Sequence, residues 1–220
     1  LILTKINKEF KINFPVNIIN IGGITNITQI TNKDNLKAYD VGPGNCLIDE
    51  WVRKNSDKLF DENGLIGKSG KVNDLIFNQA VDNFSDFSLE KSLDVKDFDI
   101  SFAKGLSLED GCATITKFSA YLVAEGLKKL DEGKNNSKLN YILCGGGRKN
   151  NFLIENIKNF ISDKEVEFTK IEDYKFNGDY IESQAFAYLA IRSYLKLPIS
   201  FPDTTRCKFP ISGGVINKNF

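Results

Sequence analysis

Glycines cluster where apolar runs of this sequence end, a pattern typical of loops that hold phosphate groups. Apolar runs at residues 16–21 and 36–41 end in Gly22-Gly23 and in Gly42-Pro43-Gly44-Asn45, and a third ends in Gly145-Gly146-Gly147. Because glycine has no Cβ, backbone N–H groups in such a loop can approach a phosphate closely. One glycine pair alone would indicate only a turn, but three such loops in one chain favour nucleotide binding.

The residue types that are missing narrow the chemistry. The 220 residues contain no histidine, which removes Ser-His-Asp catalysis, Cys-His catalysis and histidine-ligated metals. The four cysteines stand far apart without a CxxC pair, which disfavours a zinc site or a disulfide framework and favours the cytoplasm. Phosphoryl transfer requires mainly positioning and charge neutralisation from the protein, so it suits such a sequence.

The charge balance and the hydropathy disfavour two kinds of partner. The 29 Lys and Arg residues equal the 29 Asp and Glu residues, so the basic footprint expected of a nucleic-acid-binding protein is missing. No stretch approaches the roughly 18 apolar residues of a membrane span, and the first residues do not have the layout of a signal peptide. The sequence starts at Leu1 and contains no methionine, so we expect a fragment or a trimmed protein.

The elements that must position the glycine loops are a three-stranded meander and then alternating helices and strands. Apolar patterning predicts antiparallel strands at residues 16–21, 27–31 and 36–41, helices at 46–60, 71–84, 107–131, 150–161 and 179–195, and strands at 139–144 and 166–168. Residues 60–70 are expected to form a loop and residues 197–220 a tail. Residues 85–106 are expected to be irregular, either a substrate-facing insertion or a plain surface loop.

This order of elements is the order of the ribonuclease H-like unit, the repeated half of the sugar kinase, actin and Hsp70 ATPase fold. We therefore expect an α/β fold with a three-strand meander followed by αβαβα and a helical or irregular insertion. Residues 1–15 are expected to form a connector or edge element, and residues 16–220 a C-terminal, ATP-binding domain of this kind.

Several stretches, collinear along the chain after residue 15, resemble the sequence pattern of anhydro-N-acetylmuramic acid kinases. They are Asn20–Thr28 (NIGGITNIT), Asp40–Trp51 (DVGPGNCLIDEW), Ser69–Val72 (SGKV), Ala113–Ala120 (ATITKFSA), Cys144–Asn150 (CGGGRKN) and Gly178–Ala187 (GDYIESQAFA). Two segments depart from the pattern. Lys91–Val95 (KSLDV) stands where the family has KS-T-G-R, and Thr204–Cys207 (TTRC) lacks the usual TGA.

The resemblance implies an ATP-dependent kinase that opens the 1,6-anhydro ring of anhydro-N-acetylmuramic acid with water and phosphorylates O6. The product would be N-acetylmuramic acid 6-phosphate, in peptidoglycan recycling. It also implies that the catalytic aspartate and the first phosphate loop lie in an N-terminal half that precedes this chain. This chain would then be inactive alone and would pair with that half, and a homodimer stays open. Two alternatives remain: another kinase or ATPase of the same superfamily, and a degenerate module that only binds nucleotide.

The resemblance assigns the glycine loops to ATP. Gly22, Gly23 and Asn26 would form the second phosphate loop, with Gly42, Gly44 and Asn45 beside it at a helix N-terminus, where the helix dipole favours anions. Gly145, Gly146 and Gly147 would let the adenosine lie against bare backbone. Each loop could instead be only a turn. We expect the Asn150 side chain to cap the next helix, although it could contact the nucleotide.

Two carboxylates are candidates for the remaining roles. Glu182 would contact the sugar, by its place in the stretch that resembles the family pattern. Asp179 and Glu182 have the spacing of a capping box, which requires no ligand. Asp40 could hold Mg²⁺ through water, or it could cap a turn.

Overall fold

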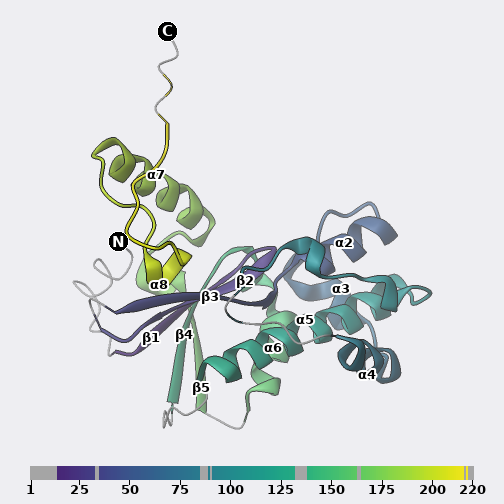
Figure 1. The fold of residues 1–220 in the computed structure, drawn as a ribbon. Helices are drawn as coiled ribbons and strands as arrows, with labels where there is room; N and C mark the ends of the chain where they lie inside the picture. Colours follow the sequence, from purple (N-terminus) through teal and green to yellow (C-terminus); the bar gives the residue numbers. More distant parts are fainter. Residues whose placement is uncertain are drawn as a thin grey trace.

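The chain folds around one mixed β-sheet in this computed structural model, which describes residues 14–32, 35–84, 89, 91–131, 138–162, 165–215 and 217. The strands are β1 (Val16–Ile21), β2 (Ile24–Ile30), β3 (Leu36–Pro43), β4 (Lys138–Cys144) and β5 (Glu165–Lys170). They lie in the order β3-β2-β1-β4-β5 (Figure 1). The β1–β2 and β2–β3 pairs are antiparallel, whereas β1–β4 and β4–β5 are parallel. This order confirms the predicted ribonuclease H-like unit.

Helices and short 3-10 turns connect the strands. The α-helices are α2 (Cys46–Asn55), α3 (Leu65–Ser69), α4 (Asp74–Asn83), α5 (Leu108–Asp131), α6 (Asn151–Phe160), α7 (Ile181–Tyr194) and α8 (Pro202–Thr205). The 3-10 turns are η1 (Glu62–Gly64), η2 (Val95–Asp97), η3 (Ser101–Ala103), η4 (Gly146–Lys149), η5 (Ile171–Tyr174) and η6 (Gly178–Tyr180). Among the described residues, no helix is both long enough and apolar enough to cross a membrane.

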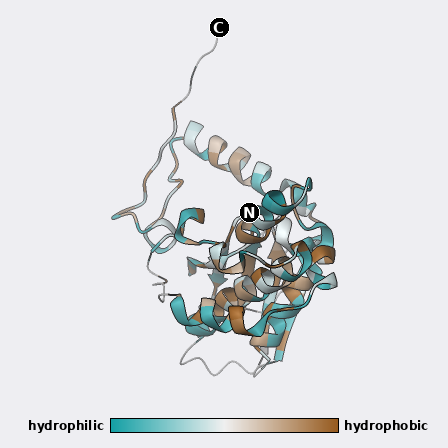
Figure 2. Ribbon diagram, turned by 90° about the vertical axis from the view of Figure 1, so that its right-hand side faces the viewer, coloured by the Kyte–Doolittle hydropathy of each residue, from teal (hydrophilic) through white to brown (hydrophobic). Residues whose placement is uncertain are grey.

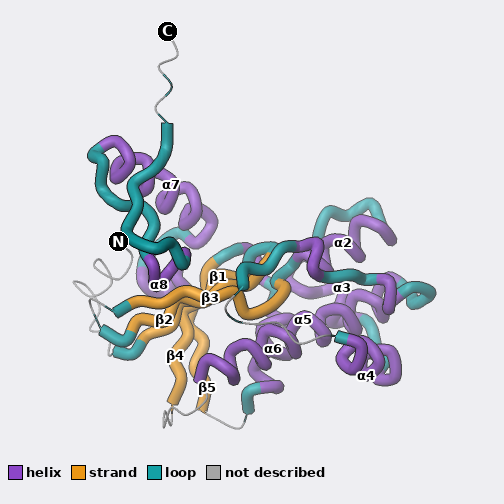
Figure 3. The backbone as a smooth tube through the Cα atoms, viewed as in Figure 1, coloured by secondary structure: helices purple, strands orange, loops and turns teal. Residues whose placement is uncertain are grey.

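The two faces of the sheet bury different amounts of apolar surface. Alternate side chains of a strand point to opposite faces, so Tyr141 and Leu143 of β4 join the large core around α5 and α6. Ile142 and Cys144 face the other way, into a smaller cluster with Ile171 and Phe176. Helices α5 and α6 lie on one side of the sheet, and α7 and α8 lie on the other (Figure 3).

Helix α5 is the centre of the large core. It begins where predicted, because the Ser107 hydroxyl accepts the N–H of Asp110 at 3.1 Å. The indole of Trp51 in α2 donates to the carbonyl of Leu108, at 2.9 Å. Ile115 and Leu127 of α5 are 0% and 1% exposed. This helix therefore fixes α2 and the sheet relative to each other.

The prediction of a loop at residues 60–70 is wrong for part of that segment. The chain forms η1 and α3 there, because the buried carboxylate of Asp61 accepts the N–H groups of Ile66 at 2.7 Å and Gly67 at 3.0 Å. A side chain four positions before the helix thus satisfies N–H groups at its start. The helix predicted at 46–60 ends earlier, at Asn55, and strand β2 begins earlier than predicted, at Ile24.

The alternative in which Asp179 and Glu182 form a capping box is also wrong. The Asn177 side chain accepts the N–H of Asp179 at 3.0 Å and starts η6, and α7 begins only at Ile181. The Asp179 carboxylate instead pairs with Arg148 and Lys149. The tail predicted from residue 197 contains the short helix α8 and a bridge between Ser200 and Ile211. Most of the segment expected to be a connector, residues 1–13, lies outside the described residues.

Candidate functional site

Two of the glycine loops lie at the same edge of the sheet. Gly22-Gly23 follows β1, and Gly145-Gly146-Gly147 follows β4. These strands are parallel neighbours in which Asn20 pairs with Cys144, so their carboxyl ends meet. Ligands of open α/β sheets bind outside the carboxyl ends of strands. The structure therefore places the first and third predicted glycine loops together at such an edge.

Several of the predicted glycines are required by packing. A Cβ added to Gly44 would lie 2.2 Å from the carbonyl oxygen of Gly22, and one added to Gly147 would lie 2.2 Å from Cγ2 of Ile21. A Cβ added to Gly42 would lie 3.0 Å from the backbone nitrogen of Val123 in α5. These glycines let two turns, or a strand and a helix, approach each other closely.

Other predicted glycines have no such packing requirement. The nearest atoms to a Cβ added to Gly22, Gly23 or Gly146 lie 3.6, 3.8 and 3.9 Å away, which is ordinary van der Waals contact. Gly23 and Gly146 are also exposed. These are the positions at which bare backbone is available to a ligand.

The backbone between β3 and α2 is engaged within the protein. The N–H groups of Gly44 and Asn45 donate to the carbonyls of Gly23 and Gly22, each at 2.8 Å, and the N–H of Cys46 donates to Gly23 at 3.3 Å. This differs from the expectation that the loop presents its amides to a phosphate. Asn45 occupies the N-cap position of α2 without a side-chain capping bond. Its side chain instead lines a pocket.

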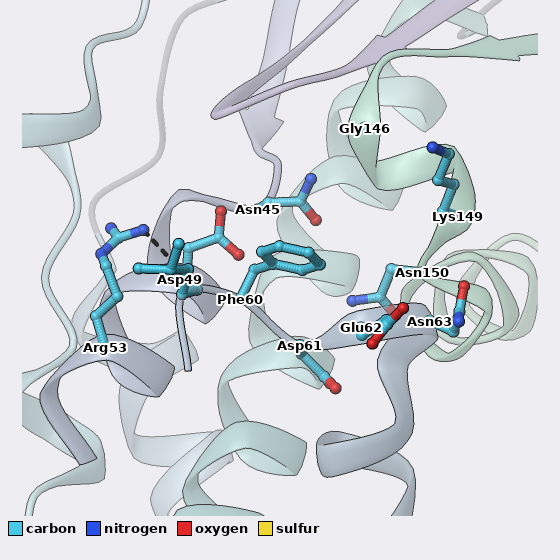
Figure 4. A pocket seen from close by; sticks show the side chains of 11 residues that line it. Asn45, Asp49, Arg53, Phe60, Asp61, Glu62, Asn63, Gly146, Lys149 and Asn150 are labelled. Atoms are coloured by element: carbon cyan, nitrogen blue, oxygen red, sulfur yellow. Dashed lines mark hydrogen bonds between the residues drawn. The ribbon is translucent and has the colours of Figure 1, made fainter. Parts of the chain in front are cut away.

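That pocket has a volume of about 470 Å³ and is lined both by Asn45 and by Gly146 of the third glycine loop. Its lining residues come from α2, from the segment around η1 and from the η4 turn: Asn45, Asp49, Arg53, Leu59, Phe60, Asp61, Glu62, Asn63, Gly146, Lys149 and Asn150. Figure 4 shows the ring of Phe60 near the middle of these side chains. Pockets of roughly 300–1,000 Å³ suit small-molecule ligands. We refer to it as the α2–η4 pocket.

The α2–η4 pocket contains a flat apolar surface and both signs of charge. Phe60 is 54% exposed, so its ring is available for stacking. Desolvation raises the pKa of Asp49 to about 6, against the opposing effect of the nearby Arg53. The Arg53 guanidinium donates to the carbonyl of Leu59 at 3.3 Å, the dashed line in Figure 4. An aromatic ring beside polar groups can bind a base and a ribose.

An ion-pair network fixes the η4 turn beside the α2–η4 pocket. Arg148, which is 2% exposed, donates to the Gly145 carbonyl at 2.8 Å, to Glu172 at 2.8 Å and to Asp179 at 2.9 Å. Lys149, which lines the pocket, also donates to Asp179 at 2.9 Å. The ion pair with Arg148 lowers the pKa of Glu172, and those with Lys149 and Arg148 lower the pKa of Asp179. The third glycine loop is thereby tied to the start of α7.

The structure confirms that the Asn150 side chain caps a helix, as predicted. Its side chain accepts the N–H of Leu153 at 2.9 Å and starts α6, while the residue also lines the α2–η4 pocket. Burial raises the pKa of Cys46 to about 11 and that of Cys144 to about 12. Both thiols next to the glycine loops are therefore protonated at neutral pH, which disfavours thiolate chemistry there.

The remaining predicted residues lie away from the α2–η4 pocket. Asn26 and Asp40 are partners in the β2–β3 pair, next to a β-bulge, and both line a second pocket. One Asp40 oxygen accepts the N–H of Leu93 at 2.9 Å. Glu182 is exposed on α7 and lines neither pocket. In the described part of the chain, no group of three acidic, histidine or cysteine side chains could hold a metal ion.

Sequence reasoning missed the charged and aromatic lining of the α2–η4 pocket. Asp49 and Lys149 lie within the stretches that resemble the kinase pattern, so their positions carried a signal. Arg53 and Phe60 lie in a helix end and a predicted loop, and they meet Gly146 only through the fold. The helical pattern around Trp51 marks core residues and gives no sign of the residues on the polar face.

Comparison with known proteins identifies related sequences over most of the chain. The model of the family described as anhydro-N-acetylmuramic acid kinase matches residues 10–219. The kinase of that name from Pelagibacter ubique is 51% identical over 96% of this chain and 57% of its own length. The one from Zymomonas mobilis is 40% identical over 92% of this chain and 54% of its own length. One solved structure that matches is an activator of 2-hydroxyisocaproyl-CoA dehydratase from Clostridium difficile with bound ADPNP. The match covers 72% of this chain and 55% of the activator chain, at 15% identity and with a TM-score of 0.42.

Proposed function

The chain belongs to the anhydro-N-acetylmuramic acid kinase family, and from this premise we propose that it supplies the ATP-binding half of such a kinase. The chain spans about half the length of the curated relatives it matches. The activity, the substrate and the partners of the whole protein are therefore all part of the proposal. Because ATP is the phosphoryl donor, the proposed location is the cytoplasm.

The proposed reaction combines ring opening with phosphoryl transfer. Water adds its oxygen to the anomeric carbon of 1,6-anhydro-N-acetylmuramic acid, and the bond between that carbon and O6 breaks. O6 takes the γ-phosphoryl group of ATP, and ADP leaves. The proton of the attacking water passes to an aspartate in the part of the protein outside this chain. This chain alone would then bind nucleotide without turning over.

The observation that carries the proposal is the group of glycines that packing does not require. Gly146 is open toward the α2–η4 pocket, and Gly22 and Gly23 are open at the neighbouring strand end. The proposed adenosine lies in the pocket with its base on Phe60, and the phosphates extend toward Gly22-Gly23. The ammonium of Lys149 and the guanidinium of Arg53 supply positive charge at the pocket wall.

Mg²⁺ is proposed to arrive with the nucleotide. Mg²⁺ commonly binds through substrate phosphates and one or two carboxylates, and it keeps several waters. The described residues fit this arrangement better than a dedicated protein cage, because no group of three suitable side chains is present. Asp40 would be the carboxylate that reaches the ion through water. Bound there, the ion would neutralise charge on the transferring phosphoryl group.

The rest of the protein is the proposed partner of this chain. Helix α7 contains no buried residue, and its side chains Phe186, Ile191 and Tyr194 are 71%, 59% and 71% exposed. Exposed apolar side chains that gather on one element mark interaction surfaces. We assign this surface to contact with the remaining half of the kinase, and we place Glu182 at the start of α7 against the sugar. A homodimer contact elsewhere on the molecule remains compatible with this assignment.

A second candidate is a module that binds nucleotide without catalysis. The departures from the family pattern at Lys91–Val95 and Thr204–Cys207 favour it. A mass-spectrometric assay of the full-length gene product with Mg-ATP, water and 1,6-anhydro-N-acetylmuramic acid separates the two. The kinase forms a hydrated, phosphorylated sugar. A folded protein that binds ATP but forms no such product would support the binding module instead.

A further inference from the structure

A second, smaller pocket lies at the β2–β3 hairpin. Its volume is about 170 Å³, and its polar lining includes Asn26, Asp40, Lys91, Ser92, Thr205 and Arg206. These residues come from the β2–β3 hairpin, from the segment before η2 and from the end of α8. The two segments that depart from the family pattern, Lys91–Val95 and Thr204–Cys207, therefore meet here. We refer to it as the hairpin pocket.

Two long-range contacts build the hairpin pocket. One oxygen of Asp40 accepts the N–H of Leu93 at 2.9 Å, which ties residues 91–93 to β3. The guanidinium of Arg206 donates to the carbonyl of Leu89, which ties the end of α8 to the same segment. Arg206 does so from a left-handed backbone conformation with φ of 56°. This conformation ends α8, where the backbone N–H of Arg206 donates to the Pro202 carbonyl at 3.0 Å.

The charges in the hairpin pocket favour an anion. Lys91 and Arg206 contribute two positive charges, and Asp40 contributes one negative charge, so the lining has a net positive charge. The hydroxyl group of Ser92 and the amide of Asn26 are further hydrogen-bond donors, whereas the Thr205 hydroxyl donates to the Phe201 carbonyl at 3.2 Å. A guanidinium presents its donors in a fork that matches a carboxylate or a phosphate.

The Gly22-Gly23 turn contacts segments that line the hairpin pocket and the α2–η4 pocket. Asn45, which lines the α2–η4 pocket, donates its backbone N–H to Gly22. Val95 lies 3.8 Å from the position of a Cβ added to Gly23, and Lys91 and Ser92 of the same segment line the hairpin pocket. In a phosphoryl transfer the acceptor and the leaving group lie roughly in line on opposite sides of the phosphoryl group. A nucleotide in the α2–η4 pocket whose phosphates reach Gly22-Gly23 would therefore have its acceptor beside the segment that lines the hairpin pocket.

We infer that the hairpin pocket binds the carboxylate of the acceptor sugar, with Arg206 and Lys91 as its two cationic contacts. This inference rests on the proposed function and deepens it, because it assigns the recognition of an acidic sugar to particular side chains. Arg206 pairs with the carboxylate through the guanidinium donors that do not face Leu89. Lys91 adds a second charge from the opposite segment. The pocket thereby distinguishes an acidic sugar from a neutral one.

The test compares two acceptors on the full-length gene product. One is 1,6-anhydro-N-acetylmuramic acid, and the other is 1,6-anhydro-N-acetylglucosamine, which lacks the carboxylate. The variants are Arg206→Gly, which suits the left-handed backbone and removes the cation, and Lys91→Gln. Lys208→Gln, at an exposed position outside the pocket, is the matched control. Affinities for both sugars and for Mg-ATP are measured on the same samples by calorimetry.

Loss of one charge-assisted contact to a carboxylate is expected to weaken binding of the acid by about tenfold or more in each pocket variant. Affinities for the neutral sugar and for Mg-ATP are expected to match those of the wild type, as is every affinity of Lys208→Gln. Equal losses for the two sugars, or no loss for the acid, would overturn the inference.

Two further outcomes separate this inference from its premise. If the wild-type protein binds Mg-ATP but neither sugar, the proposed function fails and the assignment of the acid to this pocket fails with it. Inorganic phosphate could instead bind the wild type but not Arg206→Gly, without displacing either sugar, while both proteins bind the acidic sugar equally well. The pocket would then bind a free oxyanion, and the inference would be wrong.

Discussion

Helices α5 and α7 are both rich in apolar residues, yet α5 is largely buried and α7 is not. In α5, sixteen of 24 residues are buried, from Gly111 to Asp131. In α7 none of the 14 residues is buried. Figure 2 shows hydrophobic residues along α7 although that helix stands apart from the body of the molecule. Apolar composition alone therefore does not tell whether a helix belongs to the core of its own domain.

The difference shows which contacts the chain completes by itself. Helix α5 is enclosed by α2, α6 and the sheet, so its burial stabilises this domain. Helix α7 joins the body mainly through η6, where Asp179 pairs with Arg148 and Lys149. Since the relatives are nearly twice as long as the matched region, we propose that the remaining half of the kinase covers α7. The predictions below test this contrast, beginning with the largest expected effect.

An isoleucine in each helix provides a matched pair. Ile115→Ala in α5 removes a side chain that is 0% exposed, so the free energy of unfolding is expected to fall by about 2–5 kcal/mol. Ile191→Ala in α7 removes one that is 59% exposed, with an expected change within about 0.5 kcal/mol in the 220-residue chain. Urea denaturation of both variants measures the two values. Similar losses in the two helices would contradict the contrast.

The full-length protein allows a second test with the same Ile191→Ala substitution. If the other half covers α7, Ile191→Ala is expected to become strongly destabilising there, by about 2 kcal/mol or more. The same substitution would then be nearly neutral in the short chain and costly in the long one. A neutral Ile191→Ala in both would show that α7 remains exposed.

Two adjacent glycines repeat the contrast within one loop. Gly147→Ala is expected to lower the free energy of unfolding by about 1–3 kcal/mol, because its Cβ would lie 2.2 Å from Ile21. Gly146→Ala is expected to change it by no more than about 0.5 kcal/mol, because its Cβ would meet no atom closer than 3.9 Å. Thermal unfolding of both variants decides the matter, and equal costs would show that the loop is packed on both sides.

The stabilisation from the ion pairs that connect the start of α7 to the rest of the domain is expected to depend on pH. The folded-state pKa of Glu172, lowered by its ion pair with Arg148, lies below the ordinary value, and so does that of Asp179. Carboxylates of this kind stabilise the fold fully above about pH 5, and the stabilisation is lost as the pH falls through the lowered pKa values. Arg148→Met is expected to cost about 2 kcal/mol at pH 7 and to flatten this acid limb. Urea titrations between about pH 3 and about pH 7 measure the free energy of unfolding of both proteins. If its decrease at acid pH is unchanged in Arg148→Met, the ion pairs are not the source of that decrease.

The smallest expected effect concerns Asp49 in the α2–η4 pocket. Its pKa is raised to about 6 by burial, so the folded state binds this proton more tightly than the unfolded state does. The contribution of Asp49 to stability therefore falls as the pH rises from about 4 to about 6. After allowance for solvent screening, Asp49→Asn is expected to raise the free energy of unfolding at neutral pH by about 1 kcal/mol. A destabilised Asp49→Asn variant would reveal a structural contact of the carboxylate.

The sequence predicted the sheet because its strands are short segments with recurring apolar residues, bounded by turns. Ser107 and Asn150 cap the helices predicted after them, since those caps act over three residues and are visible in the chain order. Helix α3 was missed because five residues are too few to show a period, and its stabilising partner, Asp61, acts only through the folded turn.

The candidate site was predictable to the extent that it consists of backbone. The glycine loops could be identified, but the sequence could not separate Gly146, which is open, from Gly147, which is packed against Ile21. That distinction depends on the register of β1 and β4. The contacts of Asp179 were likewise missed, because Arg148 is 31 residues away and a local capping pattern competed with it.

The central claim is that the nucleotide lies against Gly146, and the affinity of Gly146→Val for Mg-ATP tests it most directly. A Cβ added to Gly146 meets no atom closer than 3.9 Å and Gly146 lines the α2–η4 pocket, so the variant is expected to keep its melting temperature. Calorimetry of the full-length gene product is expected to show binding weakened by about tenfold or more. A folded Gly146→Val variant that binds Mg-ATP as tightly as the wild type would contradict the placement of the nucleotide.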